Sequence, residues 1–288
     1  MKRIYIILAG LALCLSSCNK ESITSSESLS ATASIDQQNT KTTYQDNGAQ
    51  SGLKVDWSQN ESFTAYYEGG SLTFNKTAGS EFIATGIPAG VTASTNFRGV
   101  YGEHVTYNSE NGKYTVDYSG QDGTLENLAK YDVMVASSTF DTEGLHFPFK
   151  HKSAFLRITL QDDVNTDGSH KDEHSTDEGR KNFKIKFNNC TLADTDINVS
   201  GFSSGTFTIN FDLKSELTNN EKRVIYVAIP AMSLTKKSGG LGLGGGTMDM
   251  SPEGYYKSIK ATMTFEAGKV YETTITYFCG TGHDLPLW

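Results

Sequence analysis

The chain has 288 residues and a formal net charge of −8, with 33 acidic against 25 basic side chains. This acidic balance argues against nucleic acid and against an anionic membrane surface as partners, since both are negatively charged. Aromatic residues make up 11% of the chain, and 28 glycines stand against only 5 prolines, which is typical of a β-protein.

The N-terminus has the pattern of a bacterial lipoprotein signal. The initiator Met1 is followed by the basic residues Lys2 and Arg3. Residues 4–13 form an apolar run that is too short to span a bilayer. They lead to Leu-Ser-Ser-Cys ending at Cys18, whose thiol would accept a diacylglyceryl group. The sequence therefore predicts a signal peptide over 1–17 and a lipid anchor on Cys18 in the outer membrane. Residues 19–21 resemble a tag for export to the cell exterior. The alternative is an ordinary signal peptide that happens to contain a cysteine.

Residues 18–39 are rich in Ser, Thr, Gln and Asn, which predicts a tether. Within it, residues 29–35 alternate apolar and hydroxyl side chains, and a period of two predicts a strand with one buried face. A strand with such small side chains would be only loosely held. The alternative is a disordered Ser/Thr tether. The buried face would consist of Leu29, Ala31, Ala33 and Ile35.

Short strand-like segments with turn residues between them then recur along the chain. In the first half, the expected strands are 53–57, 62–67, 71–74, 81–84, 97–101, 113–118 and 132–136, with one helical turn at 125–131. In the second half, they are 146–149, 153–160, 183–190, 205–212, 223–229, 256–265 and 269–278. This spacing predicts an all-β protein with two β-sandwich domains in series, over 40–145 and 146–288.

Motifs with a chemical precedent are weak in this chain. The glycine-rich run at 240–245 has dinucleotide-loop spacing, but no helix is expected after it. Asp163, Asn165 and Asp167 match the first half of a calcium loop, but His174 stands where the bidentate acid belongs. No familiar catalytic arrangement occurs. We therefore expect no enzyme activity, no cofactor and no metal site beyond this weak calcium candidate.

Two cysteines, Cys190 and Cys279, lie outside the signal region. In an oxidising compartment they would form a disulfide, and the alternative is two buried free thiols. Neither has the neighbours of a catalytic thiol.

Five motifs occur in the order seen in fimbrillin-like lipoproteins, which the chain resembles over residues 38–278. They are TKTTY at 40–44, LKVDW at 53–57, DVMVA at 132–136, FKHKSAFL at 149–156 and FEAGKVY at 265–271. The resemblance implies two transthyretin-like β-sandwich domains and a role as a structural or accessory subunit of surface fimbriae that supports adhesion. It also implies other fimbrial subunits as partners, and a host or bacterial surface ligand.

The resemblance further implies assembly by strand exchange. A protease cuts after a basic residue near the start of the first domain, an N-terminal strand leaves, and a strand of another subunit fills the groove. Here the candidate removable strand is 29–35 and the candidate cut follows Lys41. The family often has arginine near this position, and the alternative for Lys41 is a solvated charge. The alternating segment 270–278 is either a donor or an ordinary core strand.

A second hypothesis belongs to another class of protein. In it the chain is a monomeric surface lipoprotein that binds glycans by stacking sugar rings on exposed aromatic side chains. The candidates for such stacking are Tyr66, Tyr67, Tyr255, Tyr256 and Trp288.

Overall fold

The computed structural model describes residues 28–35, 45–46, 53–54, 57, 61–162, 180–217, 221–235, 247–251, 255–258 and 263–277. Within these ranges the chain is almost entirely strand, so the predicted all-β class is confirmed. The helical residues are one turn of α-helix, α1 (Leu125–Leu128), and one 3₁₀ turn, η1 (Ala129–Tyr131). None of the described helices is long and apolar enough to cross a membrane.

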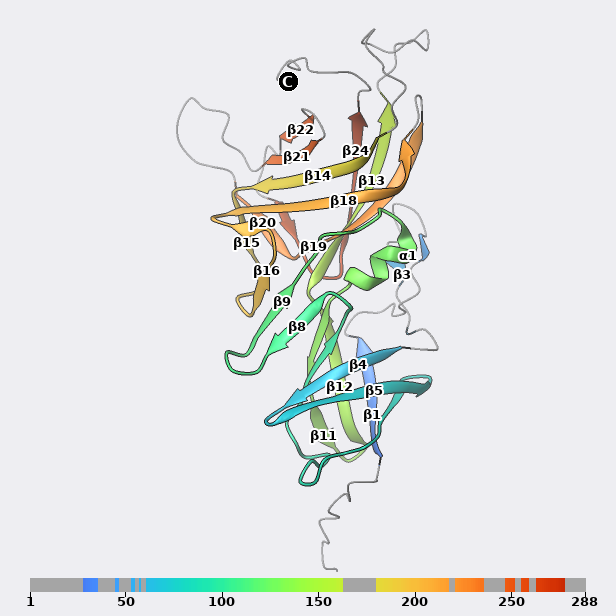
Figure 1. The fold of residues 1–288 in the computed structure, drawn as a ribbon, viewed down its shortest axis with the longest axis vertical. Helices are drawn as coiled ribbons and strands as arrows, with labels where there is room; N and C mark the ends of the chain where they lie inside the picture. Colours follow the sequence, from blue (N-terminus) through green and yellow to red (C-terminus); the bar gives the residue numbers. More distant parts are fainter. Residues whose placement is uncertain are drawn as a thin grey trace, which may run out of the picture.

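The largest sheet lies at one end of an elongated molecule and closes on itself (Figure 1). Its order is β1-β6-β5-β4-β7-β10-β12, and β12 pairs in turn with β1. All neighbours in this ring are antiparallel except β1 and β12, which are parallel. β11 adds to β12 outside the ring. The strands are β1 (Leu29–Ile35), β4 (Ser62–Tyr67), β5 (Gly70–Ala78), β6 (Glu81–Ala84), β7 (Arg98–Tyr101), β10 (Met134–Ser137), β11 (Thr139–Asp141) and β12 (Gly144–His151).

Aromatic side chains fill the inside of this ring. Each is no more than 2% exposed, and several pack edge-to-face at centroid distances near 5 Å, as Phe63 does with Phe82 and Phe147. Gly99 on β7 leaves room for them, because a Cβ there would lie 2.9 Å from the Phe147 ring and 3.0 Å from the Phe149 ring. The ring of strands is therefore packed solid. The aromatic residues are Phe63, Phe74, Phe82, Phe97, Phe147 and Phe149.

The rest of the molecule is built from smaller sheets around a second apolar core. One sheet contains β19 (Lys222–Pro230), β13 (Ser153–Asp162) and β24 (Val270–Tyr277). Another contains β17 (Phe202–Ser203), β18 (Thr206–Leu217), β14 (Arg180–Asn188), β21 (Thr247–Ser251) and β22 (Tyr255–Ser258). Three short sheets complete the described part. The first contains β15 (Cys190–Leu192), β20 (Met232–Leu234) and β23 (Met263–Phe265), and the second contains β16 (Ile197–Val199), β9 (Lys113–Val116) and β8 (Val105–Asn108). The third pairs β2 (Gln45–Asp46) with β3 (Leu53–Lys54).

The two cores do not divide the chain at the predicted place. The expected boundary between residues 145 and 146 falls inside β12, whose pairing is entirely within the first sheet. Val116, Tyr118 and Val133, from the predicted first domain, are buried in the second core. The chain thus enters the second core after β7, returns through β10 to β12, and leaves again in β13. The division into two domains stays a prediction.

The segment before α1 closes the edges of two strands in the second core. The side-chain amide of Gln121, which is 1% exposed, donates to the carbonyl of Ala228 at 2.8 Å and accepts from its N–H at 2.7 Å. The Tyr226 N–H donates to the Gly123 carbonyl, and the Asp212 N–H to the Gln121 carbonyl, both at 2.9 Å. Buried backbone groups at the edges of β18 and β19 are thereby satisfied.

A buried ion pair lies where the chain passes between the cores. His151 Nδ1 is 2.8 Å from Asp132 Oδ1, and the two side chains are 7% and 1% exposed. Burial lowers the pKa of His151, but the Asp132 carboxylate more than offsets this by its charge and its hydrogen bond, so the pKa lies above its ordinary value of 6.5. The protonated imidazole is therefore the form that the folded state stabilises.

Raising the pH above 6.5 is expected to lower the free energy of unfolding through this pair. Because the folded pKa is the higher one, the contribution of His151 is complete below the unfolded pKa and is lost as pH rises through the folded pKa. Urea midpoints at pH 6 and pH 8.5 measure the loss. Asp132→Asn should remove the His151 part of it, and Glu110→Gln, at an exposed position, should not. An unchanged pH profile in Asp132→Asn would contradict this assignment.

Candidate functional site

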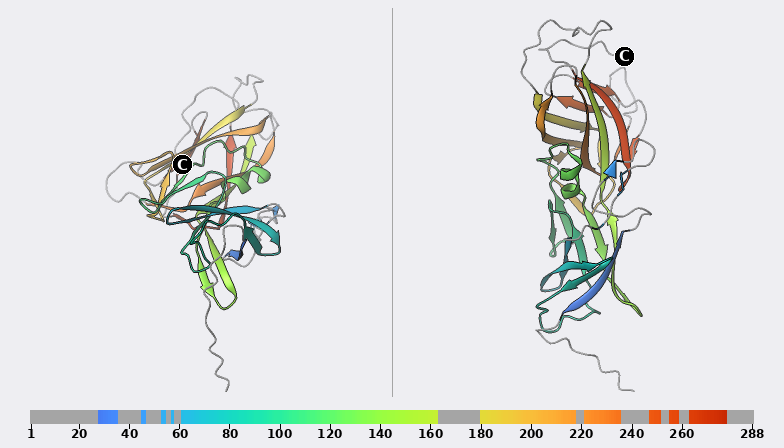
Figure 2. Two further views of the ribbon diagram at one scale, coloured as in Figure 1. Left: turned by 60° about the horizontal axis from the view of Figure 1, so that its bottom comes forward. Right: turned by 90° about the vertical axis from the view of Figure 1, so that its right-hand side faces the viewer.

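The predicted strand over 29–35 is confirmed as β1, and it occupies the closing position of the first sheet. Along one edge it runs antiparallel to β6, from Leu29 opposite Ala84 to Thr32 opposite Glu81. Along the other edge it runs parallel to β12, ending with Ile35 opposite Phe149. Figure 2 shows β1, in blue, beside the lime-green β12 in its right-hand view. Among the strands that the structure describes, β1 is therefore the one that joins β6 to β12.

The two faces of β1 differ as the alternation predicts. Ser30, Thr32 and Ser34 are exposed. The inward side chains are buried in the first core, at exposures of 1 to 7%. These inward residues are the four that the sequence singled out, namely Leu29, Ala31, Ala33 and Ile35.

On the outer face, β1 is held to β12 through one imidazole ring. Thr32 Oγ1 is 2.9 Å from His146 Nδ1, and Ser34 Oγ is 3.0 Å from His146 Nε2. Both ring nitrogens thus meet hydroxyls of the same strand. These contacts are exposed to solvent, so each contributes modestly.

Burial of apolar side chains stabilises β1 only modestly for a strand with two paired edges. Full burial of a leucine or an isoleucine is worth about 1.5–3 kcal/mol each, and the two alanines add little area. The large rings of the first core come from the other strands and would remain if β1 left. Its departure would, however, expose unpaired N–H and C=O groups on both β6 and β12.

The position of β1 in the chain differs from that of the Gln121 segment, which also covers strand edges. β1 is the first element that the structure describes, so a single cut after residue 35 would separate it from the rest of the fold. Gln121, by contrast, lies in mid-chain and is tethered on both sides. The candidate cut site Lys41 lies outside the described residues, as do Cys18 and the signal peptide.

The other candidate strand is part of the second core. β24 pairs in parallel with β13 along its whole length, from Val270 opposite Phe155 to Tyr277 opposite Asp162. β24 is paired along one edge in this sheet, and Val270 and Tyr271 pack, partly buried, against the second core, which favours the interpretation of 270–278 as an ordinary core strand for most of its length. The described part of the chain ends with β24, at the opposite end of the molecule from β1 (Figure 1). Residues 278–288 lie outside the described ranges.

Two of the tyrosines considered for sugar stacking are half-buried and have aromatic partners. Tyr66 packs on Tyr107 at a centroid distance of 5.1 Å, and Tyr67 lies edge-on to Phe97 at 5.8 Å. The side chains of Tyr255 and Tyr256, and all of Trp288, lie outside the described part of the structure. Packing of Tyr66 and Tyr67 against neighbours leaves less of each ring free for a sugar.

Cys190 is a buried free thiol. Its Sγ lies 3.3 Å from the carbonyl oxygen of Gly205, and burial raises the pKa of the thiol. Cys279 falls outside the described residues. In this environment Cys190 is a packing residue that disfavours the thiolate.

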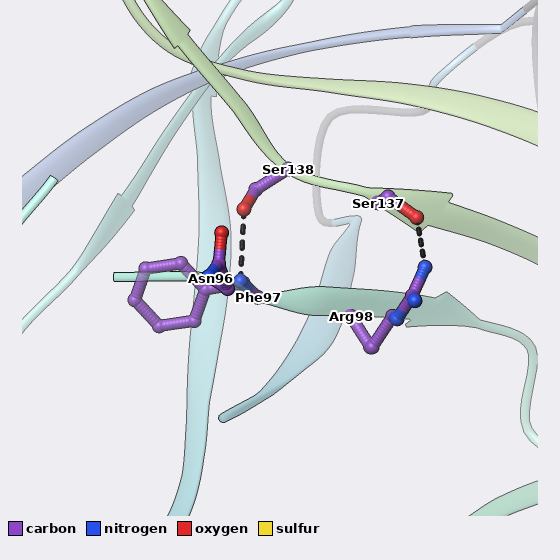
Figure 3. A pocket seen from close by; sticks show the side chains of 5 residues that line it. All are labelled: Asn96, Phe97, Arg98, Ser137 and Ser138. Carbon is purple, nitrogen blue, oxygen red and sulfur yellow. Dashed lines mark hydrogen bonds between the residues drawn. The ribbon is translucent and has the colours of Figure 1, made fainter. Parts of the chain in front are cut away.

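A shallow polar depression lies on the first sheet where β7 meets β10 (Figure 3). The Phe97 N–H donates to Ser138 Oγ at 2.8 Å, and the Arg98 guanidinium donates to Ser137 Oγ. The side chains there satisfy one another and the backbone between two strands.

Among the described residues, no group of three or more His, Cys, Asp or Glu side chains could hold a metal ion. The calcium candidates Asp163, Asn165 and Asp167 lie outside them.

Comparison with known proteins gives one family and several structural neighbours. A family model described as fimbrillin-like matches residues 22–278. A crystal structure from Bacteroides ovatus, described as a cell adhesion protein, is 12% identical, with a TM-score of 0.42, over 87% of this chain and 93% of the other. The fimbrial anchor protein Mfa2 of Porphyromonas gingivalis is 8% identical, with a TM-score of 0.31, over 78% of each chain. A fimbrial assembly protein of Parabacteroides distasonis is 14% identical, with a TM-score of 0.29, over 86% and 90%. Curated protein sequences give no match.

Proposed function

Because this chain belongs to the fimbrillin-like family, whose model it matches over residues 22–278, we propose that it is a structural or accessory subunit of surface fimbriae that supports adhesion. It is exported as a lipoprotein, anchored in the outer membrane through Cys18, and exposed at the cell surface. Proteolysis after Lys41 removes β1, and a strand of another subunit takes its place. Its partners are other fimbrial subunits, together with a host or bacterial surface ligand.

The observation that carries this proposal is the place of β1 in the first sheet. The strand closes the ring between β6 and β12, contributes only small or aliphatic side chains to the core, and comes first among the described elements. A strand in that position can leave without unthreading any other part of the fold. The two edges that it leaves are templates for another strand, since main-chain groups pair independently of sequence.

The lipid anchor has a simple physical role in this scheme. An acyl chain contributes about 0.8 kcal/mol for each buried methylene, so the lipidated precursor stays at the membrane. Cys18, the residues of β1 and Lys41 follow one another in the sequence, so the anchor and β1 both precede the cut. One cut after Lys41 would therefore release the folded subunit from its lipid at the same time as it frees β1.

Digestion with a trypsin-like protease is expected to turn the purified chain, beginning at residue 19, into stable oligomers. After the cut, β1 dissociates and the exposed edges pair with strands of other copies. Gels run without boiling would show a ladder, and boiled samples would show the cleaved monomer. Lys41→Gln should slow the cut and the ladder together. A chain that is cut after Lys41 but remains entirely monomeric would contradict the proposed assembly.

A further inference from the structure

The groove that β1 occupies does not have the same width along its length. Residues opposite one another on neighbouring strands have side chains on the same face, so the partners of each β1 residue bound the space available to it. Ala31 lies between Phe82 on β6 and Leu145 on β12. Leu29 lies opposite Ala84. The larger residue of β1 therefore has a small neighbour, and the smaller residue has large neighbours on both sides.

The space beside Ala33 is limited by a ring that has no room to move. Ala33 is 1% exposed and lies opposite Phe147, which is fully buried. The Phe147 ring packs on Phe63 at 4.8 Å and reaches across the core to within 2.9 Å of the position of a Cβ on Gly99. Because the ring already spans the core, a larger residue in place of Ala33 would have to displace several packed side chains.

We infer that this groove selects its donor strand by side-chain size. It takes a β-strand of another fimbrial subunit with glycine or alanine at the two inward positions that Ala31 and Ala33 now fill, and an aliphatic residue at the position of Leu29, which lies opposite Ala84. This selectivity rests on the proposed function, since the groove is empty only after β1 has left. Main-chain pairing supplies affinity for any strand, and Phe82, Leu145 and Phe147 exclude strands with large residues at the centre.

Competition between peptides tests this selectivity. A fluorescent peptide with the sequence of residues 27–37 is present in excess while the full chain is digested, so that it competes with self-assembly for each groove as β1 leaves, and its binding is followed by polarisation. Unlabelled peptides compete with it: the unaltered sequence, Ala31→Leu, Ala33→Leu and Ser30→Leu. Ser30 is exposed on the same strand, so Ser30→Leu adds the same bulk on the outward face.

The two inward leucine peptides should compete at least about tenfold more weakly than the unaltered peptide, which corresponds to about 1.4 kcal/mol. Ser30→Leu should stay within about twofold of it. Equal competition by all four peptides would overturn the size selectivity and leave the proposed strand exchange standing. Failure of the unaltered peptide to bind would overturn the strand exchange itself, and the selectivity with it.

Discussion

A disulfide formed by Thr32→Cys together with His146→Cys should keep the cleaved chain monomeric, and reduction should then allow it to assemble. Thr32 and His146 are paired residues of the parallel strands β1 and β12. Neighbouring strands lie about 4.8 Å apart, which is within the Cα separation that a disulfide spans. Both side chains lie on the outer face, where their replacement leaves the core unchanged. The disulfide would hold β1 in place after its covalent link to the rest of the chain has been cut.

The same sample, with and without reductant, measures this effect. The chain carries Cys279→Ser, begins at residue 19 and is digested under oxidising conditions before the sample is divided. We expect no ladder in the oxidised half and a ladder like that of the parent chain in the reduced half. Thr32→Cys alone serves as the matched control and should assemble in both halves. Equal assembly of the doubly substituted chain before and after reduction would show that β1 need not leave.

Ala33→Asp should release β1 without any protease. Ala33 is buried opposite Phe147, and the described side chains of the first core are apolar apart from tyrosine hydroxyls, so they give a carboxylate there no cation with which to pair. An unpaired buried charge costs several kcal/mol. That cost is comparable to the free energy gained by burying all the apolar side chains of β1. We therefore expect β1 to detach from the sheet while the aromatic core stays folded.

Size-exclusion chromatography of the uncleaved variant measures the outcome. Ala33→Asp should form oligomers, or expose residues 28–35 to proteolysis at a much higher rate than in the parent chain. Ser30→Asp adds the same charge on the exposed face of the same strand and should behave as the parent does. If Ala33→Asp unfolds the whole chain, as seen by loss of near-UV circular dichroism, β1 is an integral part of the fold and not a removable one.

The alternation of residues 29–35 was enough to predict β1 and its buried face, because a period of two is a local property of the chain. Its partners could not be predicted. A parallel pairing between β1 and β12 joins residues more than 110 positions apart, and its register depends on how alanines fit against Phe82 and Phe147 in three dimensions. The small side chains that make β1 look weakly held in the sequence are those that this fit requires.

The predicted boundary after residue 145 lies beside a tight turn, inside a strand of the first sheet. The small and polar residues just before it form the hairpin between β11 and β12, in which the Glu143 N–H donates to Asp141 Oδ1 and Gly144 takes a positive φ of 116°. A tight hairpin and an interdomain linker use the same small and polar residues. The sequence alone cannot distinguish them, because the difference lies in whether the next strand returns to the same sheet.

The burial of the polar side chains could not be predicted from the sequence. Asp132 and His151 lie in the motifs at 132–136 and 149–156, but neither these motifs nor the residues around Gln121 indicate that the three side chains are buried and partnered. Motif searches find groups that have a fixed spacing along the chain. These groups meet across long separations, so no spacing marks them.

The composition of the assembled oligomers tests the exchange of β1 most directly. Oligomers from the digested chain are separated from monomers, and each pool is analysed by denaturing mass spectrometry. If β1 is exchanged, the monomer pool contains the fragment that ends at Lys41 and carries β1, and the oligomers lack it. Oligomers that retain this fragment in equal amount to the rest of the chain would contradict the exchange, because every first sheet would then still be closed by its own strand.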